Sequence, residues 1–193
     1  MVITMSDPDC AVALRLPPEP GTYALVLSCT ARRSIRVGQL GTMRLQPGFY
    51  VYVGSALGPG GLRARIMHHL RRVERPHWHI DYLRTLAQVD QLWYRCDRMR
   101  LEHRCAQALE AVPGVRVPLP GFGASDCRCG SHLFLFKRRP SRTSFEGWLR
   151  ASGWGRSQLR QGAGYMQDLL QDLTRASSSA AASRTRGRGA TAG

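Results

Sequence analysis

Residues 49–70, FYVYVGSALGPGGLRARIMHHL, combine residue types that could hold a phosphate group. An apolar aromatic run, typical of a strand, breaks into glycines and is followed by a helical pattern rich in Arg and His. The segment GSALGPGG matches neither G-x-G-x-x-G nor G-x-x-x-x-G-K-[ST], so a nucleotide site has little support. We expect Gly58, Gly60 and Gly61 to form a tight turn that brings the helix N-terminus and Arg65 to a backbone phosphate of a nucleic acid.

A second group of chemically active side chains lies in SDCRCGSH, which contains Cys127, Cys129 and His132. Thiolates and imidazoles are zinc ligands, and His77 or His79 could complete a tetrahedral set. The spacing C-x-C-x₂-H differs from the usual C-x₂₋₄-C pair, however. A turn-rich loop that docks through small thiols explains the same residues. The sequence favours structural packing over zinc and leaves both open.

The charge of the chain points to a polyanionic partner. Its 28 Lys and Arg residues outnumber 13 Asp and Glu residues, the formal net charge is +15, and Lys137 is the single lysine. Without the four arginines that follow Thr174 the charge is still +11. A genome rich in G and C would explain Arg in place of Lys, but not the excess of cations. A positive field attracts nucleic acid, and guanidinium groups suit phosphate oxygens.

The composition argues against secretion and membrane insertion. The first 20 residues carry acids and prolines where a signal peptide needs a basic and then an apolar region. No apolar run approaches the length of a membrane span. We therefore expect a cytoplasmic protein in a reducing compartment, with its six cysteines as free thiols or metal ligands.

Hydrophobic patterns and turn residues predict a mixed α/β domain over residues 21–137. Strands are expected over residues 22–29, 49–56, 90–96 and 131–137, and short strands forming a hairpin or meander over 35–48. Helices are expected over residues 62–73, 75–89 and 98–112. The first of these helices has an apolar stripe at helical spacing, made of Leu62, Ile66, Leu70 and Val73.

The segments that flank this domain differ from it in composition. Residues 1–20 end in a proline-rich loop, and residues 138–173 are polar with one candidate helix at 165–176. The Ser/Ala/Arg/Gly tail of residues 174–193 is expected to be disordered. We therefore expect one domain with an extension at each end.

Two short motifs connect the predicted elements to a known family. GTY, residues 21–23, opens one strand, and YVG, residues 52–54, closes another before the helix that bears Arg and His. This arrangement resembles the GIY-YIG nuclease superfamily, with Thr22 and Val53 where Ile is usual. Three longer blocks, YVYVGSALGPGGL, HWHIDYL and PGFGASDCRCGSHLF, resemble a poorly characterised branch with a longer insertion between the two strands. The resemblance covers roughly residues 21–137.

This resemblance implies a small three-stranded antiparallel sheet with an inserted hairpin, flanked by helices. It also implies single-metal hydrolysis of a nucleic-acid phosphodiester, and it nominates Tyr23, Tyr52, Arg65, His69 and Glu102. In that reaction Arg65 clamps the scissile phosphate, and His69 relays a proton or orients a tyrosine. Tyr23 acts as base or positions the water, and Tyr52 orients water or phosphate. Glu102 holds Mg²⁺ or Mn²⁺.

The same five residues also allow roles without chemistry. Arg65 and His69 are four residues apart and share a helical face, but a histidine beside an apolar stripe is often a core residue. Tyr23 and Tyr52 could pack a core, and a phenol with a pKa near ~10 is a poor base unless a cation lowers it. Glu102 could pair with one of the many arginines.

Further residues could line the same site or contact nucleic acid. Site roles are open for His77, His79, Asp126 and His132. A solvated basic face that at most contacts backbone phosphates explains Arg63, Arg71 and Arg72. The sequence therefore predicts a metal-dependent endonuclease acting on nucleic acid, DNA before RNA, in repair, recombination or defence. The alternatives are a catalytically idle, basic nucleic-acid-binding module and, from the Cys/His loop alone, a zinc-stabilised adaptor.

Overall fold

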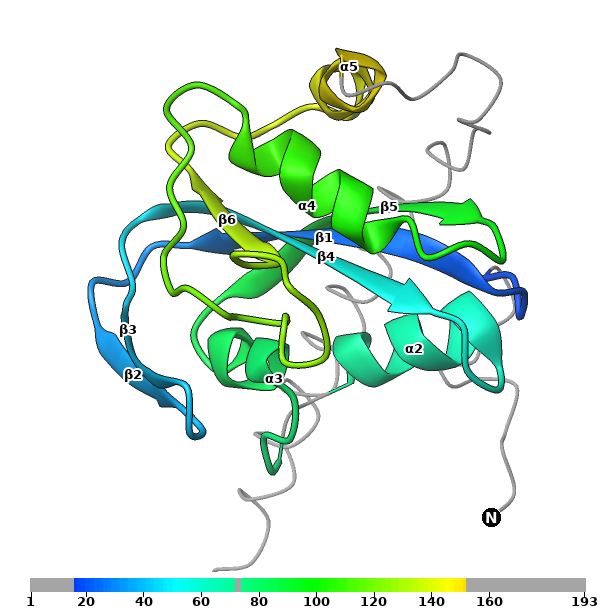
Figure 1. Cartoon of the computed structure of the whole chain (residues 1–193). Coiled ribbons are helices and arrows are strands. Elements are labelled where there is room, and N and C mark those ends of the chain that lie inside the picture. Colours follow the sequence, from blue (N-terminus) through cyan, green and yellow to red (C-terminus); the bar gives the residue numbers. More distant parts are fainter. Residues whose placement is uncertain (1–15, 72–73, 152–193) are drawn as a thin grey trace, which may run out of the picture.

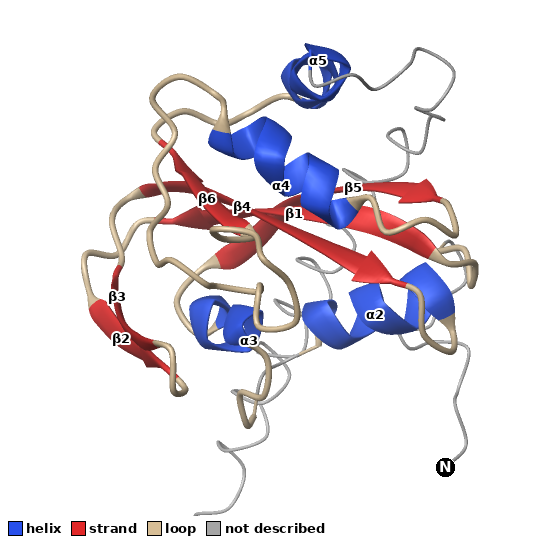
Figure 2. Ribbon diagram, viewed as in Figure 1, coloured by secondary structure: helices blue, strands red, loops and turns tan. Residues whose placement is uncertain are grey.

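A four-stranded antiparallel sheet forms the centre of the fold (Figures 1 and 2). The computed structural model describes residues 16–71 and 74–151. In sheet order the strands are β5 (Gln88–Cys96), β1 (Gly21–Cys29), β4 (Gly48–Ala56) and β6 (Leu133–Phe136). A separate two-stranded sheet, β2 (Ser34–Val37) and β3 (Gly41–Arg44), is inserted between β1 and β4.

Helices cover both faces of the sheet (Figure 2). One face carries α2 (Gly61–Leu70) and α3 (His79–Arg84), and the other carries α4 (Glu102–Glu110) and α5 (Arg142–Ala151). The expected mixed α/β class and the inserted hairpin are confirmed. The sheet has four strands instead of three, because the last apolar run of the domain, β6, pairs with β4.

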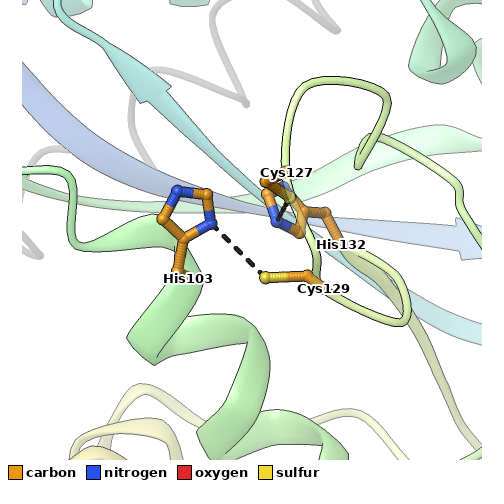
Figure 3. Close-up of side chains that lie close together, drawn as sticks. All are labelled: His103, Cys127, Cys129 and His132. Atoms are coloured by element: carbon orange, nitrogen blue, oxygen red, sulfur yellow. Dashed lines mark hydrogen bonds between the residues drawn. The ribbon is translucent and has the colours of Figure 1, made fainter.

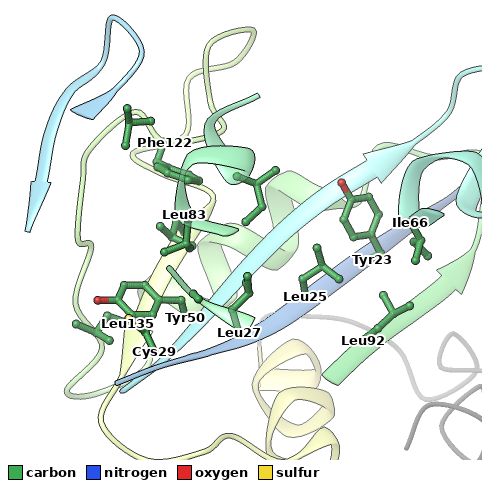
Figure 4. Close-up of a cluster of buried hydrophobic side chains, with 14 of the residues drawn as sticks. Tyr23, Leu25, Leu27, Cys29, Tyr50, Ile66, Leu83, Leu92, Phe122 and Leu135 are labelled. Carbon is green, nitrogen blue, oxygen red and sulfur yellow. The ribbon is translucent and has the colours of Figure 1, made fainter. Parts of the chain in front are cut away.

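Side chains alternate along the strands and so divide the core into two apolar clusters. In β1, Tyr23 and Leu25 point toward α2 and α3, whereas Ala24 and Val26 point toward α4 and α5. Figure 4 shows Tyr23 and Leu25 in the first cluster. The register pairs Leu25 with Tyr52 of β4. The two tyrosines of the GTY and YVG motifs therefore point to the same face.

Helix α3 is shorter than the 75–89 segment expected from the sequence. The Asp81 carboxylate accepts hydrogen bonds from the backbone N–H groups of His77 and Trp78, at 3.0 and 2.9 Å. Such a carboxylate caps a helix and fixes where it begins. The residues before His79 therefore approach the helix as an extended segment, and β5 already begins at Gln88.

Helix α5 was missed by the sequence analysis, which placed the end of the domain at residue 137. Ser141 starts the helix, since its hydroxyl oxygen accepts the Ser144 N–H at 3.0 Å. Phe145 and Leu149, one turn apart, are buried in the second apolar cluster. Three apolar residues, Phe145, Trp148 and Leu149, stand there at helical spacing, a signal that the surrounding polar residues obscured. The candidate helix at 165–176 and the tail lie outside the described residues.

The N-terminus of α2 is closed by the chain that precedes β1. The Leu62 N–H donates to the Glu19 carbonyl at 2.9 Å, and the Arg63 N–H donates to the Pro17 carbonyl at 3.0 Å. Gly61 has a φ of 53°, and a Cβ at this position would overlap the Glu19 carbonyl. The glycine turn thus serves close packing of the backbone. The expectation that this helix N-terminus faces a phosphate is wrong, because its first amides are already bonded.

Candidate functional site

A polar pocket of about 400 Å³ lies beside the end of β4. Strand β6 pairs with residues 49–52, so none of the described strands pairs with the last part of β4 on that edge. Side chains from both layers meet there. The pocket is lined by Tyr23, Tyr52, Gly54, Ser55, Arg65, His77, Trp78, His79, Glu102, Gly123, Ser125, Asp126 and His132. Glu102, from the first turn of α4, therefore shares one concavity with the residues of the opposite face.

His69 supports the pocket from behind Tyr23. Its Nε2 lies 2.7 Å from the Tyr23 hydroxyl, and the ring is buried. Burial, followed by the neighbouring His68 and Arg65, lowers the pKa of His69 to about 3, so the ring is neutral at pH 7. Burial, followed by Tyr52, raises the pKa of Tyr23 well above its usual value. The pair is therefore a neutral phenol beside a neutral imidazole.

Two glycines allow the tyrosines to take these positions. A Cβ on Gly54 would lie 2.5 Å from the Tyr23 hydroxyl oxygen, and a Cβ on Gly123 would lie 2.8 Å from the Tyr52 ring. Burial raises the pKa of Tyr52 to about 12, and Arg65 opposes that rise. The glycine of YVG is thus required by the tyrosine of GTY on the neighbouring strand.

Arg65 is held over the ring of Trp78. Its guanidinium carbon lies 4.3 Å from the ring centroid, a cation–π geometry. His68 packs against the same indole at 4.1 Å between centroids, and the His68 Nε2 lies 3.7 Å from Asp81. The ion pairs of the described residues do not include Arg65. Its charge is therefore positioned at the pocket without being neutralised by a carboxylate.

Glu102 is a buried carboxylate with an unsatisfied oxygen. It is 4% exposed, and its Oε2 has no hydrogen-bond partner among the described residues. Its Oε1 lies 3.6 Å from the His103 Nε2. The arginine salt bridge considered from the sequence does not form in the described part of the chain. A buried, unpaired carboxylate oxygen is costly, and a divalent cation in the polar pocket would satisfy it.

A second chemical group, the His/Cys cluster (Figure 3), adjoins the pocket through His132, which also lines it. It consists of His103, Cys127, Cys129 and His132, whose potential ligand atoms all lie within 4.8 Å of one another. The Cys127 Sγ is 3.5 Å from the His132 Nε2, and the Cys129 Sγ is 3.4 Å from the His103 Nδ1. These four side chains could hold a metal ion.

Comparison with known proteins bears on the whole domain. Residues 22–151 match the family described as Domain of unknown function DUF123. The chain belongs to the DUF123 family. The match ends with α5, the helix that closes the second apolar cluster of this DUF123 domain. No curated protein and no solved structure matches the chain in the same comparisons. None of the helices described in this DUF123 protein is long and apolar enough to span a membrane.

The fourth member of the His/Cys cluster in this DUF123 protein comes from α4. The expectation that His77 or His79 completes the set is wrong. His79 Nδ1 instead accepts the Gly123 N–H at 2.9 Å and anchors the loop, while His77 is exposed at the pocket. Spacing did not reveal His103, which lies far from Cys127 in the sequence. One feature of the sequence indicated that His103 belongs to a site, namely its position next to Glu102.

Among the remaining predicted residues of the DUF123 protein, Asp126 lines the pocket, whereas the described residues that line it do not include Arg63 or Arg71. Arg63 is half-buried, and its Nε donates to the Leu16 carbonyl at 2.8 Å, so part of its guanidinium is already used. Arg71 is exposed, and Arg72 lies outside the described residues. Asp126 is exposed at the pocket, 4.0 Å from an Arg100 nitrogen.

Proposed function

We propose that this DUF123 protein is a metal-dependent endonuclease of the GIY-YIG type that hydrolyses phosphodiester bonds in nucleic acid, DNA before RNA. One observation carries the proposal. Tyr23, Tyr52, Arg65 and Glu102, which the sequence resemblance nominates from four separate segments, line one pocket, with His69 hydrogen-bonded behind Tyr23. Repair, recombination and defence are the settings that such an activity would serve.

The proposed chemistry begins with a positioned water. Phosphodiester hydrolysis needs an oriented nucleophile and stabilisation of the charge that develops on phosphorus-bound oxygens. In the tautomer of neutral His69 that carries its proton on Nδ1, Nε2 accepts the Tyr23 O–H hydrogen bond, which leaves the Tyr23 oxygen lone pairs to accept a hydrogen bond from the attacking water. Tyr52, with a pKa of about 12, stays protonated and donates to the phosphate or the water.

Arg65 supplies the fixed positive charge in this proposal. The Trp78 ring under its guanidinium restricts where that charge can lie. A preorganised cation aimed at the non-bridging oxygens stabilises the transition state without reorganising at the moment of reaction. Arg65 can bind the phosphate with two parallel hydrogen bonds, which a lysine could not do.

Glu102 would hold Mg²⁺ or Mn²⁺ at the same pocket. Its buried Oε2 without a partner fits such an ion, and Mg²⁺ commonly takes only one or two protein carboxylates and fills its other positions with water and phosphate. When bound, the ion would act as a Lewis acid and lower the pKa of a bound water. A pocket of about 400 Å³ has room for a phosphate and several waters.

Nucleic acid is the favoured substrate because of charge. The chain has a formal net charge of +15, and each cationic side chain that contacts a phosphate increases the affinity for a polyanion. The alternative, an idle nucleic-acid-binding module, would use the same charge. Such a module would not require two tyrosines, an arginine, a histidine and an unpaired carboxylate to converge.

The proposal is tested with labelled duplex, single-stranded and flapped substrates, in Mg²⁺ or Mn²⁺ and in EDTA. Arg65→Ala and Glu102→Gln should each lower the cleavage rate by roughly 10²–10³, the usual loss for one preorganised transition-state contact. Glu110→Gln, on the exposed side of the same helix, is the matched control and should cleave like wild type. Glu102→Gln should also remove the metal dependence, whereas Arg65→Ala should keep it.

Binding without metal separates the two candidate functions. The surrounding arginines still hold the backbone in both variants, so the affinity measured in EDTA should change little. Wild-type protein that binds all substrates and cleaves none in either metal would establish the idle module instead. Cleavage that survives Glu102→Gln would remove Glu102 from the metal site.

A further inference from the structure

The His/Cys cluster is a metal site in its own right. We infer that His103, Cys127, Cys129 and His132 bind one zinc ion, which ties the loop on the pocket wall to the first turn of α4. The inference rests on these four side chains and does not depend on the proposed nuclease activity.

The spacing of the ligand atoms matches a tetrahedral zinc centre. Zinc bonds of roughly 2.3 Å to sulfur and 2.0–2.1 Å to nitrogen place a sulfur and a nitrogen roughly 3.6 Å apart and two sulfurs roughly 3.8 Å apart. The two sulfur–nitrogen distances in the cluster are 3.5 and 3.4 Å. All four atoms lie within 4.8 Å of one another, so a contraction of about 1 Å would bring them to tetrahedral spacing.

The donor set selects zinc among common metals. Two thiols and two imidazoles form a soft set without an oxygen ligand, which suits zinc and not magnesium or calcium. Four protein ligands also close a tetrahedral centre and leave no position for substrate, as in structural zinc sites. The competing explanation is one S–H···N hydrogen bond in each Cys–His pair. Two such separate bonds would not require the ligand atoms of both pairs to lie within 4.8 Å of one another, as they do.

The position in the fold gives such an ion a structural role. His103 is on α4, whereas the three other ligands lie on the loop before β6 (Figure 3). This loop, residues 111–132, carries no helix or strand among the described elements and consists largely of turns. It also supplies pocket residues such as Gly123 and Asp126. A zinc ion would therefore cross-link this long irregular loop to α4 at the part of the loop that forms one wall of the pocket.

The same ion would position Glu102. His103 faces Cys129 through Nδ1, so zinc bound at that nitrogen leaves the proton on Nε2. The Nε2 lies 3.6 Å from the Glu102 Oε1. A histidine that binds metal through one nitrogen commonly turns its other N–H toward a carboxylate, which fixes the orientation of both groups. Zinc bound to His103 would thus fix the orientation of Glu102 toward the pocket, although Glu102 is not itself a zinc ligand.

Metal analysis of the purified full chain tests the inference. Wild-type protein prepared with reductant and zinc should contain about one zinc per chain by mass spectrometry of the metal. Cys127→Ser and Cys129→Ser should each lose most of it. Cys96→Ser, at an exposed thiol on β5, is the matched control and should keep the wild-type content. Circular dichroism of each variant reports whether the domain is still folded.

Cobalt replacement in the wild-type protein gives a readout that does not require a variant to fold. Wild-type protein reconstituted with Co²⁺ should show thiolate-to-cobalt charge-transfer bands and the intense visible bands of tetrahedral cobalt. His103→Gln should change these bands or remove them. Substoichiometric zinc in wild type, together with a weak octahedral cobalt spectrum, would overturn the inference. A Cys127–Cys129 disulfide in protein kept under reductant would overturn it as well.

The two proposals fail in different ways. Glu102→Gln should keep one zinc while cleavage is lost. Stoichiometric zinc in a protein that cleaves no substrate leaves the zinc site standing and removes the nuclease. Cleavage by protein without zinc, at the wild-type rate and with the wild-type melting temperature, would show that the cluster neither binds a structural ion nor positions Glu102.

Discussion

Glu102 and His103 are neighbours in the chain, yet they face groups of opposite chemistry. Glu102 lines a polar pocket together with Tyr23, Tyr52 and Arg65, and one of its oxygens has no hydrogen-bond partner among the described residues. His103 turns toward Cys129, and each potential ligand atom of the His/Cys cluster already lies near another. The unpaired Glu102 oxygen in the pocket indicates that a cation or ligand binds there from solvent. The close spacing of the ligand atoms in the His/Cys cluster indicates that an ion bound there would hold parts of the protein together.

Ionisation follows the same division. In the pocket, burial keeps Tyr23 and His69 neutral, so the formal charges among the residues that line it are those of Arg65, Glu102 and Asp126. In the cluster, burial and Cys127 raise the pKa of Cys129 to about 11. Thiols beside one another favour the neutral state until a cation binds. The pocket is therefore suited to bind an anion together with its counterion, whereas the His/Cys cluster is suited to bind only a cation.

Among changes that keep every polar group of the pocket, the largest effect should come from crowding it. Gly54→Ala places a methyl group 2.5 Å from the Tyr23 oxygen, so the tyrosine or β4 must move. Overpacking of this kind costs about 1–3 kcal/mol in the free energy of unfolding. A 1 Å displacement of a positioning group can lower the cleavage rate roughly 10²-fold.

Gly58→Ala is the matched control for this crowding experiment. Nothing lies within 4 Å of a Cβ at that position, so urea unfolding and cleavage should both stay near wild type. Zinc content should be the same in both variants, since neither glycine contacts the cluster. Equal stability and activity of the two variants would show that Tyr23 is not held as described.

The next effect concerns the dependence of stability on pH. The pKa of His69 is about 3 in the folded protein and about 6.5 in the unfolded chain, so only the unfolded chain takes up this proton between those values. The stability that the neutral ring contributes is therefore present above pH 6.5 and is lost as the pH falls toward 3. From pH 7 to pH 5 the loss from this one group is about 2 kcal/mol.

His69→Gln tests this loss, because glutamine does not titrate but can still bond to Tyr23. Urea unfolding at pH 7 and at pH 5 should show a difference about 2 kcal/mol smaller in the variant than in wild type. His79 and His132, whose pKa values are also lowered by burial, account for part of the slope that remains. An identical pH dependence in both proteins would mean that His69 is not buried as a neutral ring.

A smaller effect should follow from releasing Arg65. Trp78→Leu removes the ring under the guanidinium while keeping an apolar side chain. Cation–π contacts contribute about 0.5–2 kcal/mol, so kcat/KM should fall roughly 2- to 30-fold. Trp78→Phe keeps a ring and should lose less. Zinc content should not change in either variant, because Trp78 belongs to the pocket and not to the cluster.

The pocket was more predictable from the sequence than the cluster. Continuous apolar and aromatic runs predict the strands of Tyr23 and Tyr52, and the antiparallel register of these strands puts both side chains on one face. Helical spacing likewise puts Arg65 and His69 on one side of α2. The sequence resemblance supplied Glu102, but only the short β6, which leaves the end of β4 open, explains how a residue of α4 reaches the pocket.

The features that could not be predicted depend on contacts between distant segments. The start of α3 is set by a carboxylate that bonds to the two residues before the helix, and hydrophobic periodicity carries no trace of such a bond. The amides of α2 are used by carbonyls of residues 17 and 19, which appear in the sequence only as a proline-rich loop. His103 joins the cluster through the packing of α4 against the loop. No spacing rule connects residues that meet only in the folded chain.

The smallest effect on the chemistry is expected from the arginine-rich segment at the end of the sequence. Residues 174–193 carry four arginines and no acidic residue. Each phosphate contact that is lost lowers the slope of log affinity against log salt by about 0.9, so deleting this segment should flatten the slope by at most about 4. Affinity at low salt should fall, whereas the melting temperature, the zinc content and the cleavage rate at saturating substrate should stay unchanged.

Replacing Arg175, Arg184, Arg186 and Arg188 with Gln in the full chain should reproduce the deletion, because charge and not length is responsible. A slope that survives both changes would confine the polyanion to the folded domain, and a full chain that binds without any salt dependence would contradict an electrostatic interface altogether.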